Sequence, residues 1–182
     1  MSKIFFGGSR ALSRLNDAIE TRLQNVIDGN HTVLIGDANG ADKAIQRFFA
    51  EAGYRNLIVY CMEGVCRNNV GNWNVRSVHS EKRKKDFSYF ALKDQEMSRE
   101  AEHGCMFWDG KSKGALNNVL NMLQQGKTSL IYFAPRKAFI TVKTPSNLDA
   151  LLSYCDSKSQ AYFDKTIHLS ERSNTLQVAM HF

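Results

Sequence analysis

The sequence predicts an α/β fold: an open parallel sheet of about five strands with helices on both faces. Short apolar runs alternate with segments whose apolar residues recur at helical spacing, and glycine-bearing turns follow the apolar runs. Strands that are joined through helical crossovers pair in parallel, and such a sheet buries both of its faces. The alternation therefore indicates repeated strand–helix units on one sheet.

The individual elements follow from these two periodicities. Strands are expected at residues 3–6, 31–35, 57–61, 105–108 and 129–133. Helices are expected at residues 12–27, 44–52, 87–102 and 115–125. The stretch 63–86 is polar and rich in asparagine, and a loop of this length inside a domain is usually functional or mobile.

The pattern changes near residue 135. An edge strand is expected at 139–142, followed by short helices at 147–154 and 160–164. We therefore expect a nucleotide-binding domain over residues 1–135 and a short α/β extension over residues 136–182 that packs on it.

Composition excludes several classes of protein. The chain has 182 residues, of which 43% are apolar and 23% charged, which argues against disorder and against a disulfide scaffold. No apolar run approaches the roughly 18 residues that span a bilayer. The N-terminus does not resemble a signal peptide, and the four cysteines form no CxxC pair, so reduced thiols in a cytoplasmic protein are expected. Nothing predicts a metal or a cofactor.

The net charge of +6 is concentrated in one stretch. Between Arg67 and Lys85 there are six Arg or Lys residues against the single Glu81. A basic loop attracts nucleic acid, and Trp73 and Phe87 could stack on the bases of a single strand. The alternative is a solvated loop whose charges only keep the protein soluble.

Three turns follow predicted strands and carry the candidate ligand-binding residues. The carboxyl ends of parallel strands meet at one edge of the sheet, and the helix N-termini that follow suit an anion such as phosphate. The candidates are Gly8, Ser9 and Arg10 in the first turn, Gly36, Asp37, Gly40, Ala41 and Asp42 in the second, and Gly110, Lys111, Ser112 and Gly114 in the third. The turns match neither GxGxxG nor the P-loop motif.

Four carboxylates divide into caps and site groups. Asp42 stands where a helix begins and is expected to cap it, whereas Asp37 is better placed to hold ribose hydroxyls. Asp94 completes the apolar stripe of its helix, which is costly unless it is paired, for example with Arg10, or faces a cavity. Asp109 ends a strand at the ligand edge.

The segments GGSR, GDANGADKAIQRFFAEAG and KDQEMSREAEHGCMFWDGKSKGALNNVLNMLQQGK resemble the SLOG superfamily, particularly its YspA/YpsA-like branch. More distantly, they are similar to nucleoside 2-deoxyribosyltransferases. The resemblance covers about residues 3–134 and implies a Rossmann-like sheet that binds nucleotides at these loops. Some members, the LOG phosphoribohydrolases, cleave the N-glycosidic bond of nucleoside monophosphates, and DprA-type members bind single-stranded DNA.

The chain departs from the LOG motif PGGxGTxxE. Aligned on Gly114, it has Ala115 for the Thr and Asn118 for the catalytic Glu. We therefore expect a domain that binds a nucleotide-type ligand as a sensor or sequestering protein. The first alternative is a nucleotide N-glycosidase or transferase in which Asp94 and Asp109 are catalytic, and the second is single-stranded nucleic-acid binding through the basic loop. Monomer and homodimer both remain open.

Overall fold

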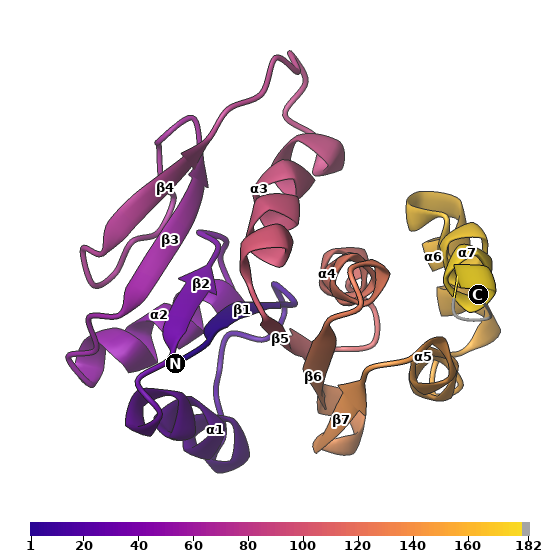
Figure 1. Cartoon of the computed structure of the whole chain (residues 1–182), viewed down its shortest axis with the longest axis horizontal. Helices are drawn as coiled ribbons and strands as arrows, with labels where there is room; N and C mark the ends of the chain where they lie inside the picture. The colour runs from indigo at the N-terminus through magenta and orange to yellow at the C-terminus, as the bar shows by residue number, and fades with distance from the viewer. Residues whose placement is uncertain (180–182) are drawn as a thin grey trace.

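The computed structural model describes residues 1–179 and contains one seven-stranded sheet (Figure 1). The strand order is β4-β3-β2-β1-β5-β6-β7, and every pairing is parallel except that of β6 with β7. The strands are β1 (Lys3–Gly8), β2 (Thr32–Ile35), β3 (Leu57–Met62), β4 (Asn74–Val78), β5 (His103–Trp108), β6 (Thr128–Phe133) and β7 (Ala138–Val142). The predicted α/β class is confirmed, with seven strands in place of about five.

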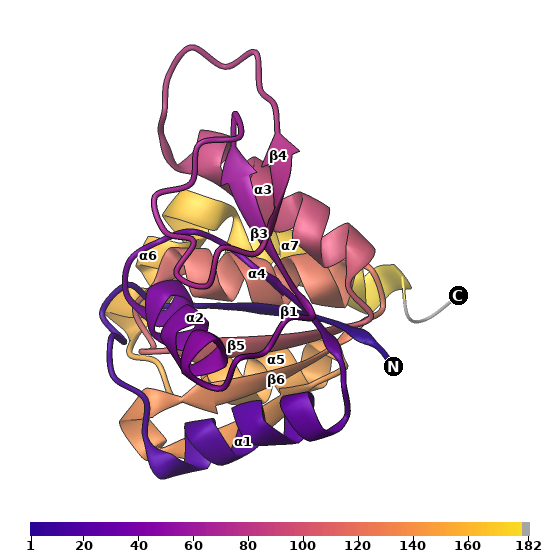
Figure 2. The same ribbon diagram turned by 90° about the vertical axis from the view of Figure 1, so that its left-hand side faces the viewer.

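The sheet is covered by helices on both faces (Figures 1 and 2). On one face lie α1 (Asp17–Asp28) and α2 (Ala41–Glu51), and on the other lie α3 (Phe87–Glu100) and α4 (Lys113–Gln124). Strands β2, β3 and β4 extend the sheet in one direction from β1, whereas β5, β6 and β7 extend it in the other. The strand order therefore reverses between the neighbouring strands β1 and β5. Ligands of such folds bind at this switch point, beyond the carboxyl ends of the strands.

Alternation along β1 shows how the sheet divides two apolar cores. Phe5 packs with the core under α3 and α4, whereas Phe6 packs with the core under α1 and α2. Successive side chains of a strand point to opposite faces, so a strand covered on both sides is a continuous apolar run. This explains why the predicted strands of the first half read as short apolar runs.

The sequence did not predict β4, which lies inside the expected 63–86 loop. Its residues, Asn74–Val78, pair in parallel with β3 at the edge of the sheet, and most of its side chains are exposed. Only one side of an edge strand is paired, and this one has no apolar alternation to reveal it. Two loops remain: residues 63–73 connect β3 to β4, and residues 79–86 extend away from the body of the molecule toward α3 (Figure 2).

The C-terminal extension adds the antiparallel strand β7 and three helices, α5 (Pro145–Leu152), α6 (Ser157–Ile167) and α7 (Leu169–Ala179). They lie on the side of α4 (Figure 1). The Arg172 guanidinium of α7 donates to Asn117 Oδ1 at 2.7 Å and to Asn121 Oδ1 at 2.9 Å, both on α4. These bonds tie the extension to the helix that follows β5. No helix in the described part of the chain is long and apolar enough to cross a membrane.

Candidate functional site

A cavity of about 570 Å³ lies at the carboxyl edge of the sheet, where β1 and β5 are adjacent. Its walls come from the turns after β1, β2 and β5 and from the facing sides of α3 and α4. The volume lies in the range of small-molecule sites, and the position is the switch point of the fold. This cavity is the candidate site.

Ser9 fastens the ends of β1 and β5 together. Its Oγ donates to Asp109 Oδ1 at 2.8 Å and accepts from the Asp109 backbone N–H at 3.1 Å. Gly8 allows this close approach, because a Cβ there would lie 2.5 Å from the Phe107 carbonyl oxygen and 2.7 Å from Ala41 Cβ. Ser9 is fully buried and does not line the cavity, so its hydroxyl has a structural role: it holds the ends of β1 and β5 together.

Asp109 organises the turn that leads into α4. Besides Ser9, its Oδ1 accepts from the backbone N–H groups of Lys111 at 2.9 Å and Ser112 at 2.8 Å. Ser112 is in turn the N-cap of α4 and accepts from Ala115 N. Lys113 and Gly114, the first residues of α4, line the cavity, so the positive end of the helix dipole lies at its wall.

A buried lysine that the sequence analysis missed stands on the other wall. Lys93 of α3 is 3% exposed, and its Nζ lies 2.9 Å from Asp94 Oδ1 and 3.8 Å from Asp37 Oδ1. Burial by itself lowers the pKa of Lys93, but the surrounding carboxylates outweigh it and raise that pKa, so the ammonium stays charged. The sequence contained a signal for this burial. Lys93 follows Phe90 by three residues and precedes Met97 by four, a helical spacing that puts it on their apolar face.

Gly36 makes room for this cluster at the end of β2. A Cβ on Gly36 would lie 2.6 Å from Lys93 Nζ and 2.7 Å from Asp42 Oδ2. Asp42 lines the cavity and accepts from the Ala38 backbone N–H at 3.2 Å. Burial raises the pKa of Asp42 to about 7, and the nearby Asp94 contributes to this rise, whereas Lys93 opposes it. The cap of α2 is Gly40, so the predicted capping role of Asp42 is wrong.

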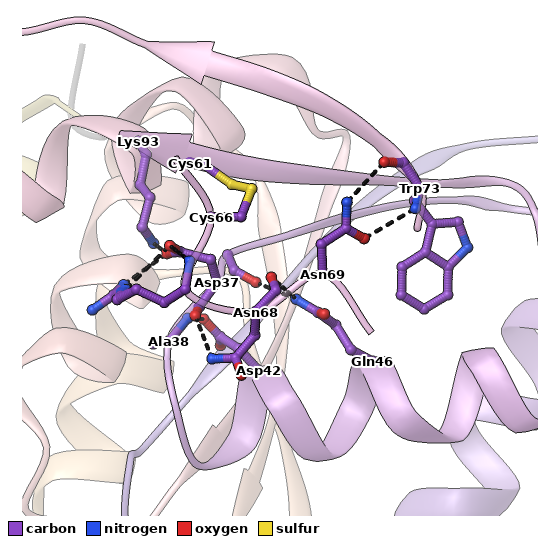
Figure 3. The surroundings of a disulfide bond; sticks show 12 residues. Asp37, Ala38, Asp42, Gln46, Cys61, Cys66, Asn68, Asn69, Trp73 and Lys93 are labelled. Atoms are coloured by element: carbon purple, nitrogen blue, oxygen red, sulfur yellow. Dashed lines mark hydrogen bonds and ion pairs between the residues drawn. A yellow bond between two sulfur atoms is a disulfide. The ribbon is translucent and has the colours of Figure 1, made fainter. Parts of the chain in front are cut away.

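Both carboxylate oxygens of Asp37, which is labelled in Figure 3, accept hydrogen bonds from Arg67. The Arg67 side chain donates to both carboxylate oxygens, at 2.7 Å and 3.1 Å, and its backbone N–H donates to Oδ2 at 3.0 Å. Burial raises the pKa of Asp37, but these hydrogen bonds outweigh it, so the pKa lies below its ordinary value. Asp37 does not line the cavity, and neither oxygen is free for ribose.

The loop that carries Arg67 is held by a disulfide (Figure 3). Cys61, at the end of β3, is bonded to Cys66, with the two Cα atoms 5.0 Å apart. The expectation of four reduced thiols is therefore wrong for this pair, whereas Cys105 and Cys155 are free. A five-residue separation forms no recognised motif, and only the return of the loop after β3 brings the two sulfurs together.

Trp73 is not a stacking platform. It is 7% exposed, and its indole N–H donates to the Tyr54 carbonyl at 2.7 Å. The Asn69 side chain bonds both the N–H and the carbonyl of Trp73 (Figure 3). The predicted exposed tryptophan of the basic loop is thus a buried anchor. Arg67 pairs with the buried Asp37, although its own side chain is 37% exposed. The other basic residues of this stretch, Arg76 and those at 82–85, are exposed as well.

The structure brings most of the predicted residues to one cavity. Its lining includes Gly8, Arg10, Gly36, Asp42, Asp94, Asp109, Lys111, Ser112 and Gly114. Ser9, Asp37, Gly40, Ala41 and Gly110 lie in the same turns but outside the lining. Asp94 faces the cavity, and its ion-pair partner is Lys93 and not Arg10, which was the example offered by the sequence. Lining residues that the sequence analysis did not name as site residues include Lys93, Lys113 and Tyr162.

In residues 1–179, no group of three or more His, Cys, Asp or Glu side chains is placed to hold a metal ion. No protein-family profile matches the chain, and no curated protein has a sequence that matches it.

Proposed function

We propose that the protein binds a nucleotide or nucleotide-derived ligand in the cavity at the β1–β5 edge, as a sensor or sequestering protein. The observation that carries this proposal is the cavity itself, in which a basic rim and a buried carboxylate cluster face one space. Arg10, Lys111, Lys113 and the N-terminus of α4 line the cavity together with Asp42, Asp94 and the buried Lys93.

The basic groups and the carboxylates suit the two polar parts of a nucleotide. Backbone N–H groups at a helix N-terminus and nearby cations attract phosphate. Carboxylates accept hydrogen bonds from hydroxyl groups, so Asp42 and Asp94 are suited to the sugar. The resemblance of the three turns to the SLOG superfamily supports the same assignment, because those turns supply much of the cavity wall.

The test is thermal unfolding in the presence of mono-, di- and cyclic adenine and guanine nucleotides. Binding to the folded state alone raises the melting temperature. Arg10→Ala should weaken the shift, whereas Arg14→Ala, an exposed arginine outside the cavity lining, should leave it unchanged. No shift with any nucleotide at millimolar concentration would contradict the proposal.

A second candidate function is N-glycosidic cleavage or transfer on nucleoside monophosphates. It is favoured by Asp94, which lines the cavity and whose one side-chain hydrogen bond within residues 1–179 is accepted by Oδ1 from Lys93. Asp109 is less available as its partner, because its Oδ1 already accepts from Ser9, Lys111 and Ser112. Release of free base, followed by chromatography and lost in Asp94→Asn, would favour this function over binding alone.

A further inference from the structure

The C-terminal extension contributes a side chain to the candidate site. Tyr162 of α6 lines the cavity and is 46% exposed. The ammonium of Lys113, in the first turn of α4, lies 4.6 Å from the centre of the Phe87 ring and 6.0 Å from the centre of the Tyr162 ring. At the rim, the cation of α4 therefore lies against two rings, one from α3 and one from α6, which are far apart in the sequence.

The position of Tyr162 is set by its neighbour. Phe163 is fully buried, and its ring centre lies 5.9 Å from that of Trp108 at the end of β5. The Trp108 indole N–H donates to the carbonyl of Ser112, the N-cap of α4, at 3.0 Å. Helix α6 is thus anchored to the same turn from which Lys113 projects.

The contacts of Lys113 leave its charge uncompensated. Among the described residues, no carboxylate oxygen lies within 4.0 Å of its Nζ. An aromatic face attracts a cation without accepting its N–H groups as a carboxylate would. A lysine held in this way has less side-chain freedom to lose when it meets an anion, and its donors remain available.

We propose that Phe87 and Tyr162 hold Lys113 as the contact for a phosphate group of the ligand, so that the C-terminal extension is part of the site. Lys113 binds the anion, and the two rings are positioning residues. The inference rests on the proposed nucleotide-binding function and adds to it which cation reads the phosphate and what keeps it in place. The same chemistry would accept the phosphates of a nucleotide or free pyrophosphate.

The experiment measures binding of AMP, adenosine and pyrophosphate by calorimetry to the full-length protein. Wild type should bind AMP more tightly than adenosine. Lys113→Met should weaken AMP and pyrophosphate roughly tenfold and leave adenosine unchanged. Tyr162→Ala should weaken AMP and pyrophosphate roughly two- to fivefold, and Tyr162→Phe should restore wild-type affinity because it keeps the ring.

Two controls separate positioning from general damage. Tyr154→Ala removes another half-exposed tyrosine that lies under a cation, Arg136 at 4.4 Å, but outside the cavity lining, and it should leave all three affinities unchanged. The double variant Lys113→Met with Tyr162→Ala should bind AMP no more weakly than Lys113→Met alone, because Tyr162 acts through Lys113.

Equal losses for AMP and adenosine in Tyr162→Ala, or additive losses in the double variant, would overturn the role of Tyr162. Another outcome is a wild type that binds pyrophosphate but no nucleotide, with pyrophosphate affinity falling in Lys113→Met and Tyr162→Ala as described above. That result would support the Lys113 contact and contradict the proposed function. Binding of neither pyrophosphate nor nucleotide would overturn both.

Discussion

At the scale of single residues, the site depends on a lysine and three carboxylates that share one buried space. The Lys93 ammonium pairs with Asp94 at 2.9 Å and with Asp37 at 3.8 Å. Lys93 and Asp42 both lie against Gly36. An isolated buried charge is costly, and mutual compensation is what makes such a cluster tolerable. Because Asp42 and Asp94 also face the cavity, the charge balance of the site and the stability of the fold depend on the same groups.

The first prediction concerns the pH dependence of stability through Asp42. Its pKa is raised from 3.8 to about 7, so the folded protein holds this proton more tightly than the unfolded chain. Its contribution to the free energy of unfolding is therefore fully present below pH 3.8 and is lost as the pH rises through about 7. In urea unfolding, Asp42→Asn should become more stable relative to wild type over this window, by about 1.4 kcal/mol per unit of pKa difference.

Asp17→Asn serves as the control for Asp42→Asn, because Asp17 is exposed at the start of α1. Its stability relative to wild type should not follow the pattern of Asp42→Asn. A stability difference between Asp42→Asn and wild type that stays constant from acid to neutral pH would show that burial does not perturb Asp42 in this way.

The second prediction concerns Lys93. Lys93→Met should reduce the free energy of unfolding at neutral pH by about 3–5 kcal/mol, because it leaves buried carboxylates without their cation. Adding Asp94→Asn should recover part of the loss, since that change removes the carboxylate in closest contact with Lys93. Chemical denaturation of the single and double variants measures this, and equal stability of the two would argue against the pairing.

At the scale of elements, the loop between β3 and β4 is a braced part of the site. The disulfide holds its start, and Asn68 donates to the Asp37 carbonyl at 2.7 Å. Gln46 of α2 donates to the Gly36 carbonyl at 2.9 Å and accepts from the Val70 N–H at 3.0 Å. The loop therefore fastens the turn after β2, which carries Asp37, and the start of α2, which carries Asp42, to β3.

The third prediction tests this bracing. Cys66→Ser should lower the free energy of unfolding by about 2 kcal/mol, because it releases a short covalent loop. It should also speed hydrogen exchange at the Arg67 N–H, which is bonded to Asp37 in the wild type. Cys155→Ser, at a free and half-buried thiol, is the matched control. Unchanged exchange at Arg67 in Cys66→Ser would mean that the ion pair holds the loop alone.

At the scale of the whole molecule, charge is unevenly distributed between the site and the projecting loop. Residues 82–85 are all basic and exposed, and the loop ends beside the cavity, where Lys85 and Asp86 belong to its lining. Because Trp73 is buried, this surface presents cations to a nucleic acid but no exposed tryptophan on which a base could stack. Its attraction for single strands is expected to be electrostatic and independent of base sequence.

The fourth prediction follows from that distribution. Affinity for an unstructured oligonucleotide should fall with log salt at a slope of about −0.7 for each phosphate neutralised. Charge reversal of Lys82, Arg83 and Lys84 should remove the binding without changing the melting temperature, because these side chains are exposed. Fluorescence anisotropy over a salt series measures both effects. A strong preference for one base sequence would require contacts beyond those of the exposed cations.

The sequence by itself determined the α/β class, the parallel strands β1, β2, β3, β5 and β6, and the turns at the carboxyl edge of the sheet. These features are local, because the apolar period of a segment shows whether it forms a strand or a helix. The start of α1 was less well determined. The helical spacing from Leu12 predicted an early start, but Asn16 caps the helix and α1 begins at Asp17.

Only the tertiary structure decided which polar groups meet. The Cys61–Cys66 bond, the Arg67 pair that occupies Asp37, and the edge strand β4 all depend on how the 63–86 segment returns to the sheet. The contact of Tyr162 with Lys113 depends on the docking of α6 against Trp108. Such contacts join residues that are not neighbours on one helix face or strand, so no local periodicity encodes them, and packing of the completed core selects them.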